Sequence, residues 1–244
     1  MLKTALENLL FIDIETVPAC AEFDDLNSEW KKLWEEKVRK TIPENETAAS
    51  FYSLRAGVMA EFSKIICISV GFCKREGKEL EFRVKSFYGD DEQILLSDFL
   101  KTLRQLESGK SNWSFCGHNI KEFDVPFICR RLLANGLDMP ASLDFQNMKP
   151  WEANMIDTFQ YWRFGDYKNF TSLKLLAAVL GIASPKDDID GSQVADVYWK
   201  EKNLQRIVTY CQKDVVTTAN IVMRFNNLPL ISDDQILIVT GKKV

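Results

Sequence analysis

Apolar residues along the chain follow two spacings, one typical of strands and the other of helices. Leu9–Thr16 is a near-continuous apolar run, as expected for a strand that is covered on both faces of a sheet. Ile65–Cys73 and Phe82–Tyr88 are rich in β-branched and aromatic residues, and the polar turn Lys74–Lys78 between them predicts a hairpin. Trp113–Gly117 predicts a further short strand.

Apolar side chains three and four residues apart predict the helices. Asp90–Leu106 has one apolar face and reads as an amphipathic helix. Val125–Ala134 is expected to be a helix, with Asp124 as its N-cap and Asn135-Gly136 as its end. Three later helices are expected over Ser172–Leu180, Val194–Lys200 and Leu204–Arg224.

The order of these elements indicates a single α/β domain over residues 1–244, with a mixed sheet flanked by helices. Residues 18–60 interrupt the pattern: they are acidic and then basic, with aromatic residues at helical spacing, and they predict an inserted helical segment that covers or gates a cleft. The tail from Ile231 to Val244 is either an additional strand or a loose end.

Composition limits the class of protein. A chain of 244 residues with 46% apolar residues can bury a large core. Its six cysteines are scattered without a C-x-x-C pair, which favours a reduced, cytoplasmic setting over a zinc cluster. Leu9–Ile14 is too short to span a bilayer, so no membrane association is expected. A net charge of −4 argues against binding of nucleic acid through a global basic field.

Two acids stand out within the first apolar run. Asp13 and Glu15 are two residues apart on a strand, so both carboxylates project from the same face. Like charges on a buried face repel each other and resist burial. The pair is stable if a divalent cation sits between the carboxylates, or if the strand end opens to solvent. An isolated D-x-E more often marks a solvated strand end, but the apolar run before it weakens that interpretation, because the run is typical of a central strand.

Asp124 is the second candidate, at the end of the sequence GHNIKEFD, where a strand leads into a helix. Ligands bind at the carboxyl ends of strands in open α/β sheets, so Asp124 is well placed to share a site with Asp13 and Glu15. Helix capping alone also explains it.

Tyr210 and Asp214 are the third candidates. They lie one turn apart on the last long helix, on the flank of its apolar stripe, so they share a boundary face. A tyrosine and an aspartate at this spacing are also commonly only a local hydrogen-bonded pair.

Together the sequences FIDIET, GHNIKEFDVPFI and YCQKD resemble the three motifs of the DEDD exonucleases, in the order found in the tyrosine subgroup. The resemblance extends over about residues 9–225 and is nearest to the predicted 3′-to-5′ exonucleases related to the exonuclease domain of family B polymerases. It implies an RNase H-like fold with a five-stranded mixed sheet flanked by helices.

The resemblance also implies a set of roles. Asp13, Glu15, Asp124 and Asp214 match the acids that bind two divalent ions, and oxygen ligands suit Mg²⁺ or Mn²⁺. Tyr210 would orient the attacking water, because its ordinary pKa near 10 makes it a weak general base.

Substrate contacts are predicted for residues next to these acids. They are Thr16, His118, Asn119 and Phe123. His118 precedes Asn119 in the second motif and does not match the base of the histidine subgroup, which lies in the third motif. Phe170 and Trp162 either stack on bases or pack in the core, and Asp157-Thr158 is expected to cap a helix.

The sequence therefore predicts a metal-dependent exonuclease that acts on the 3′ end of single-stranded nucleic acid and releases nucleoside monophosphates. The polymerase-type resemblance favours DNA, and an exoribonuclease acting on RNA or short oligonucleotides is an alternative. Two further hypotheses are a catalytically silent nucleic-acid-binding or scaffold protein on the same fold, and an RNase H-type endonuclease. A role in proofreading would depend on association in trans with a polymerase or repair factor.

Overall fold

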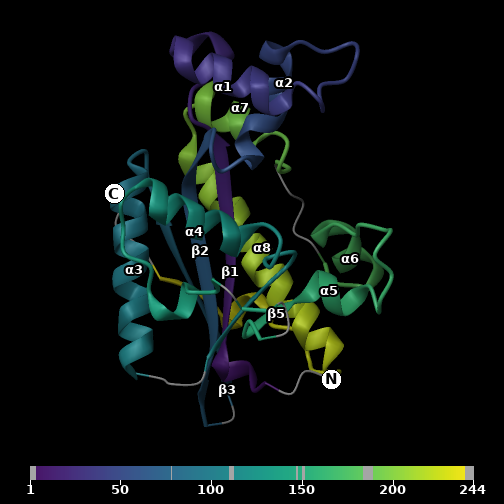
Figure 1. Cartoon of the computed structure of the whole chain (residues 1–244). Coiled ribbons are helices and arrows are strands. Elements are labelled where there is room, and N and C mark those ends of the chain that lie inside the picture. Colours follow the sequence, from purple (N-terminus) through teal and green to yellow (C-terminus); the bar gives the residue numbers. More distant parts are fainter. Residues whose placement is uncertain are drawn as a thin grey trace.

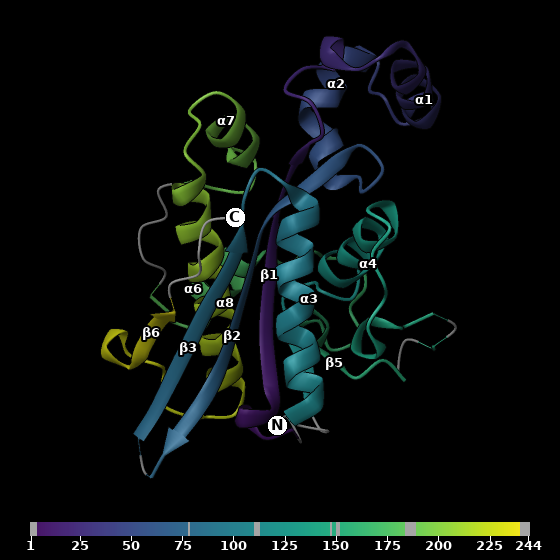
Figure 2. The same cartoon turned by 90° about the vertical axis from the view of Figure 1, so that its left-hand side faces the viewer.

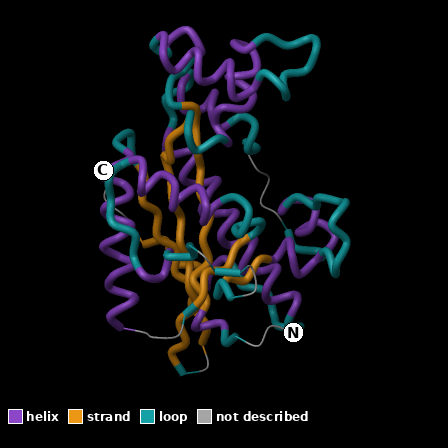
Figure 3. The backbone as a smooth tube through the Cα atoms, viewed as in Figure 1, coloured by secondary structure: helices purple, strands orange, loops and turns teal. Residues whose placement is uncertain are grey.

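A mixed sheet forms the centre of the molecule (Figure 3). The computed structural model describes residues 4–77, 79–109, 113–146, 148–149, 152–183 and 189–239. Within them, six strands are ordered β5-β4-β1-β2-β3-β6. They are β1 (Leu9–Pro18), β2 (Ser63–Glu76), β3 (Glu79–Tyr88), β4 (Ser114–Gly117), β5 (Met155–Asp157) and β6 (Ile236–Val239). β2 is antiparallel to β1 and β3, whereas the β1–β4, β4–β5 and β3–β6 pairs are parallel.

Helices cover both faces of this sheet (Figure 2). They are α1 (Ser28–Val38), α2 (Ala48–Arg55), α3 (Glu92–Gly109), α4 (Asp124–Ala134), α5 (Thr158–Trp162), α6 (Leu173–Val179), α7 (Val194–Trp199) and α8 (Leu204–Phe225). Alternation along β1 assigns its faces: Leu10 and Ile12 join the core beneath α3 and α4, and Phe11 joins the core beneath α8. None of these helices is long and apolar enough to cross a membrane, within the described residues.

The predicted α/β fold is confirmed, with one correction to its strand count. The sheet has six strands instead of five, because Ile236–Val239 in the tail pairs in parallel with Phe82–Lys85 at the outer edge of β3. The tail was expected to be either a strand or a loose end, and its first part is a strand; residues 240–244 lie outside the described residues, as does Lys78 of the hairpin turn.

The segment 18–60 builds a small helical unit at the end of the sheet to which β1 points (Figure 1). Its aromatic core centres on Trp34 and Tyr52, whose rings meet edge to face at 5.2 Å. The Trp34 indole donates a hydrogen bond to the Ala48 carbonyl at 2.7 Å, which ties α1 to the start of α2. The segment therefore has its own apolar core beside the sheet.

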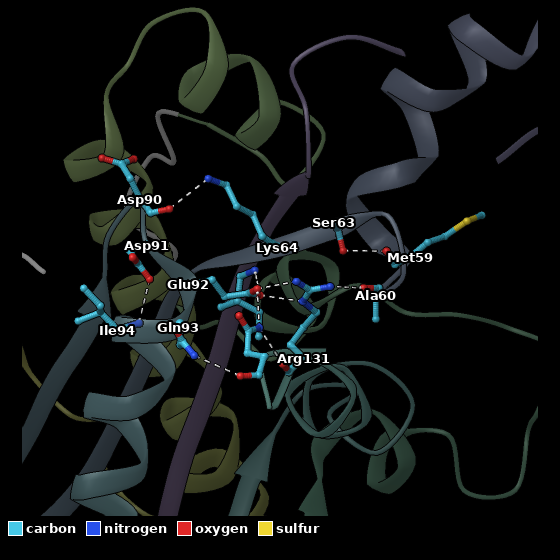
Figure 4. A network of polar contacts seen from close by, with 12 residues as sticks. Met59, Ala60, Ser63, Lys64, Asp90, Asp91, Glu92, Gln93, Ile94 and Arg131 are labelled. Carbon is cyan, nitrogen blue, oxygen red and sulfur yellow. Dashed lines mark hydrogen bonds and ion pairs between the residues drawn. The ribbon is translucent and has the colours of Figure 1, made fainter. Parts of the chain in front are cut away.

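A buried ion pair fixes the point where this segment rejoins the sheet (Figure 4). The Arg131 guanidinium donates to both carboxylate oxygens of Glu92, at 2.9 and 2.6 Å, and to the Ala60 carbonyl at 2.8 Å. Glu92 also accepts from the Ile65 amide at 2.7 Å and from the Asn135 side chain at 2.9 Å. One carboxylate thus links α3, α4 and the start of β2.

Arg131→Met is expected to destabilise the protein by about 3–5 kcal/mol, because it leaves the Glu92 carboxylate buried without its charged partner. Urea unfolding followed by circular dichroism would measure the change. Arg104→Ala is the matched control: its ion pair with Asp138 is exposed and 4.0 Å long, so its loss should change stability by less than about 0.5 kcal/mol. Equal effects of the two substitutions would contradict the role given to the buried pair.

Candidate active site

The site begins where β1 and β4 separate. The two strands pair only over Leu9–Phe11 and Ser114–Cys116, although β1 continues to Pro18. At Gly117 a Cβ would lie 1.9 Å from the Ile120 side chain and 2.9 Å from a β1 carbonyl oxygen, so only glycine fits where the chain leaves the sheet. Beyond Phe11, the β4 side of β1 is therefore available to other groups.

Asp124 occupies this side of β1. Its Oδ1 accepts a hydrogen bond from the Ile14 amide at 3.1 Å, and the side chain is buried. Asp124 is the first residue of α4 and Phe123 is its N-cap residue, so the prediction that Asp124 caps the helix is wrong. Its carboxylate replaces a missing strand partner instead, which places it beside Asp13 and Glu15 as the motif predicts.

Asp13 and Glu15 project from the α8 face of β1, opposite Ser69 and Cys67 of β2. Glu15 is buried and Asp13 is half-buried. The register between the strands shifts directly after Glu15, so that Ile66 of β2 is skipped by the pairing. A bulge of this kind bends a strand locally and redirects its side chains, and here it lies next to the two acids.

α8 brings three further side chains to the acids of β1. The Cys211 thiol donates to the Asp13 carboxylate at 3.3 Å and lies 3.5 Å from the Asp13 carbonyl oxygen. Potential ligand atoms of Asp13, Glu15 and Cys211 lie within 4.8 Å of one another. Tyr210 and Asp214 form a hydrogen bond at the same end of the site. Sequence reasoning missed Cys211, since its place in the apolar stripe of the helix gave no reason to treat it as polar.

The four acids act on one another. Burial, followed by the charges of Asp124, Asp214 and Glu15, raises the pKa of Asp13 well above its ordinary value. Burial and the charge of Asp214 likewise raise the pKa of Glu15. Burial raises the pKa of Asp124 to about 7, against the opposing hydrogen bonds from backbone amides. The acids of three distant stretches are thus clustered, and the charge of Asp214 disfavours the ionisation of each of the other three.

The two remaining groups of the site stay protonated. Burial, then the charges of Asp214, Glu15 and Asp13, raises the pKa of the Tyr210 phenol. Burial, then a hydrogen bond with Cys67, raises the pKa of the Cys211 thiol. Beside this thiol, the cluster offers the carboxylate oxygens of Asp13 and Glu15 as possible metal ligands. Such oxygens are the ligands of hard cations such as Mg²⁺ and Mn²⁺.

Two of the residues predicted to contact substrate have partners within the chain. The Thr16 hydroxyl donates to the Gly57 carbonyl at 2.6 Å. Both ring nitrogens of His118 are engaged, Nδ1 with the Thr158 hydroxyl and Nε2 with the Thr171 carbonyl, each at 2.9 Å. Burial lowers the pKa of His118, which favours the neutral ring. Thr16 and His118 therefore position neighbouring segments, and their contact with substrate stays a prediction.

Asn119 and Phe123 are the other two residues predicted to contact substrate. Asn119 has φ 64, and its amide nitrogen donates to Asp157 at 2.9 Å, while its buried side-chain oxygen has no hydrogen-bond partner among the described residues. A buried acceptor left unpaired in this way is available to a ligand. Phe123 is half-buried and packs against Phe127 at 5.3 Å. Asp157 also accepts from the Phe159 amide and caps α5, which confirms its predicted role.

The mixed sheet, the helices on both faces and the cluster of acids beside β1 define an RNase H-like fold of the kind found in polymerase exonuclease domains. The chain belongs to the family described as predicted 3′-5′ exonucleases related to the exonuclease domain of PolB, whose model matches residues 58–232. The matched region carries Asp124, Tyr210 and Asp214. Asp13 and Glu15 precede it, and they reach the same pocket because β1 pairs with β2 and β4.

A solved structure shares this fold. It is the family B DNA polymerase from the hyperthermophilic archaeon Pyrobaculum calidifontis, with a TM-score of 0.54 and 15% sequence identity. The similarity covers 89% of this chain and 24% of the polymerase chain, so the chain corresponds to about a quarter of that polymerase. No curated protein matches the sequence.

Stability of the metal-free protein is expected to fall as the pH rises. The pKa of Asp124 is about 7 in the folded protein against an ordinary 3.8, so folding favours the protonated form, and the associated stability is lost as the pH increases through about 7. In EDTA, the Tm should drop between about pH 4 and pH 7, the interval between the two pKa values. Asp124→Asn, which keeps an acceptor for the Ile14 amide, should flatten that drop.

The control is Asp138→Asn, which removes a fully exposed carboxylate. Its Tm should follow the wild-type pH dependence. If Asp124→Asn and Asp138→Asn gave the same slope as the wild type, the buried carboxylate would not be the titrating group.

Proposed function

We propose that this chain is a 3′-to-5′ exonuclease of the tyrosine DEDD subgroup that releases nucleoside monophosphates from the 3′ end of single-stranded nucleic acid. The observation that carries the proposal is the clustering of Asp13, Glu15, Asp124 and Asp214, in which the charge of Asp214 raises the pKa of each of the other three. Such a cluster is unfavourable by itself, and cations bound between the carboxylates would relieve the repulsion.

These four acids would hold two divalent ions, Mg²⁺ or Mn²⁺. When bound, such ions lower the pKa of a coordinated water and stabilise negative charge on the leaving oxygen of the phosphodiester. The donor set fits this group of metals, because it consists mainly of carboxylate oxygens. The family match and the polymerase-like fold support the same class of reaction.

The side chains around the acids control their geometry. The Ile14 amide fixes one oxygen of Asp124, and the Cys211 thiol fixes one oxygen of Asp13. Tyr210 keeps its proton, so it would orient the attacking water through a hydrogen bond and would not act as a general base. Asn119 would bind the terminal nucleotide through its unpaired side-chain oxygen.

Substrate preference, location and partners are extensions of this proposal. DNA is favoured over RNA because the family is related to a DNA polymerase domain. Phe123 would contribute an apolar contact to the terminal base. All six cysteines are free thiols, which agrees with the proposed cytoplasmic setting. A polymerase or repair factor that binds in trans is the proposed partner, by analogy with the polymerase that shares the fold.

Incubation of the purified protein with a 5′-labelled single DNA strand and Mn²⁺ should shorten the strand stepwise and release mononucleotides. EDTA should abolish the reaction, and Asp13→Asn should lower the rate at least about a hundredfold, because a ligand of the ions is lost. Asp138→Asn should retain the wild-type rate, since that carboxylate is exposed and follows the C-terminal end of α4, whereas Asp124 begins that helix. Gel electrophoresis of timed samples and chromatography of the products measure both outcomes.

Three results would contradict the assignment, and each points to a different protein. An unaltered strand that is bound with the same affinity indicates a catalytically silent binding protein. Internal fragments without mononucleotides indicate an endonuclease. Cleavage of an RNA strand but not of the matching DNA strand indicates an exoribonuclease.

Tyr210→Phe removes the phenolic hydroxyl and keeps the aromatic ring, so it tests the role of the hydroxyl alone. Loss of this group should lower kcat about tenfold or more with little change in KM, because the hydroxyl orients the water and does not bind the strand. Steady-state rates on the same DNA strand measure the split. A variant with unchanged kcat would remove Tyr210 from the proposed mechanism.

A further inference from the structure

Aromatic side chains gather on an exposed loop that the proposed mechanism does not use. Residues 161–170, which we call the aromatic loop, run from the end of α5 toward α6 (Figure 1). Tyr161, Phe164, Tyr167 and Phe170 are exposed by 45%, 92%, 76% and 65%. Large apolar groups exposed together in this way mark interaction surfaces more often than isolated exposed residues do.

The most exposed ring has an unfavourable backbone. Phe164 has φ 44 and is followed by Gly165 at φ 88, and a bulky residue rarely adopts this left-handed conformation. The turn is held by internal bonds: Asp166 accepts from the Lys168 amide at 3.0 Å and from the Asn169 side chain at 2.8 Å. The backbone conformation that holds this ring in solvent is therefore energetically unfavourable. Strain of this kind clusters at functional sites.

The aromatic loop is attached to the second motif of the candidate active site. The Thr171 carbonyl, directly after the loop, accepts from His118 at 2.9 Å. Arg163 forms an ion pair with Glu122 at 3.7 Å, and the Phe159 ring lies 5.0 Å from Phe170. His118 and Glu122 flank Asn119 and precede Asp124 on the same short segment, so the loop is held on the chain segment that carries one of the four acids.

Cations are interleaved with these rings. The Arg163 guanidinium lies 4.3 Å from the centre of the Tyr167 ring and 5.2 Å from that of Phe159. Lys168 follows Tyr167 directly. Aromatic faces beside arginine and lysine bind single-stranded nucleic acid without sequence preference, because every base offers a π-face and every nucleotide a phosphate. Trp162, by contrast, packs against the core beneath α6, which is one of the two roles predicted for it.

We propose that the aromatic loop is a stacking platform for the bases of a single strand whose 3′ end lies at the acid cluster, with Phe164 and Tyr167 as the stacking rings. The inference rests on the proposed function for the identity of the ligand. It adds a second area of contact, which binds nucleotides upstream of the one that is removed. Strand affinity would then come largely from a surface outside the catalytic pocket.

Fluorescence anisotropy of a labelled oligothymidylate of about ten nucleotides tests the platform without requiring cleavage. The full chain carries Asp13→Asn throughout, so that the strand stays intact. Phe164→Ala and Tyr167→Ala should each raise the Kd about tenfold, and Phe164→Trp should restore it to within about twofold of the parent, because tryptophan also stacks. Leu133→Ala is the matched control, since Leu133 is a 60% exposed apolar residue on α4 outside the loop.

A strand of abasic nucleotides separates stacking from phosphate binding. Phe164→Ala and the parent should bind that strand equally, since no bases remain to stack. The inference is overturned if both alanine variants bind oligothymidylate as the parent does, which would leave the loop as a surface for a protein partner. It is also overturned if the loss of affinity persists on the abasic strand.

The two proposals fail separately. Loop-dependent binding by a wild-type protein that cleaves no strand contradicts the exonuclease and leaves the platform intact. Stepwise cleavage by the wild type, combined with loop-independent binding, contradicts the platform and leaves the exonuclease intact.

Discussion

Repulsion between clustered carboxylates is the constraint around which this molecule is organised. Asp13 and Glu15 lie on the central strand, which is held by hydrogen bonds on both sides and cannot move its acids apart. Asp124 and Asp214 approach these two acids from two helices. An isolated domain gains nothing in stability from such a cluster, so the arrangement makes physical sense as a binding site for positive charge.

The fold creates this pocket by ending one strand pair early. β4 leaves β1 at Gly117, where a larger residue would collide with the β1 backbone. The Ile14 amide then needs an acceptor, and Asp124 provides it, so a requirement of the sheet orients a carboxylate of the site. The same departure produces the turn that contains Asn119, with its unpaired side-chain oxygen. The position of Asp124 and the conformation of Asn119 thus both follow from the early end of β4.

Sequence patterns predicted the parts of this arrangement that depend on local periodicity. The strand spacing of Asp13 and Glu15 and the apolar stripe of α8 were sufficient to predict which side chains share a face. Contacts between elements were not accessible in this way. Asp124 was expected to cap its helix. Its actual hydrogen-bond partner, the Ile14 amide, is 110 residues away in the chain, so no local pattern indicates it. Cys211 was read as apolar, since only its contact with Asp13 reveals a polar role.

Segments outside the sheet differ in what they can contribute to function. The buried pair of Glu92 and Arg131 fixes the place where the segment 18–60 returns to β2, so this segment is tied to α4, the helix that begins with Asp124. The aromatic loop is tied to the second motif through His118. Both attachments involve the chain region from His118 to Arg131, which includes Asp124. The two segments outside the sheet are therefore each fixed to the part of the chain that supplies one of the four acids.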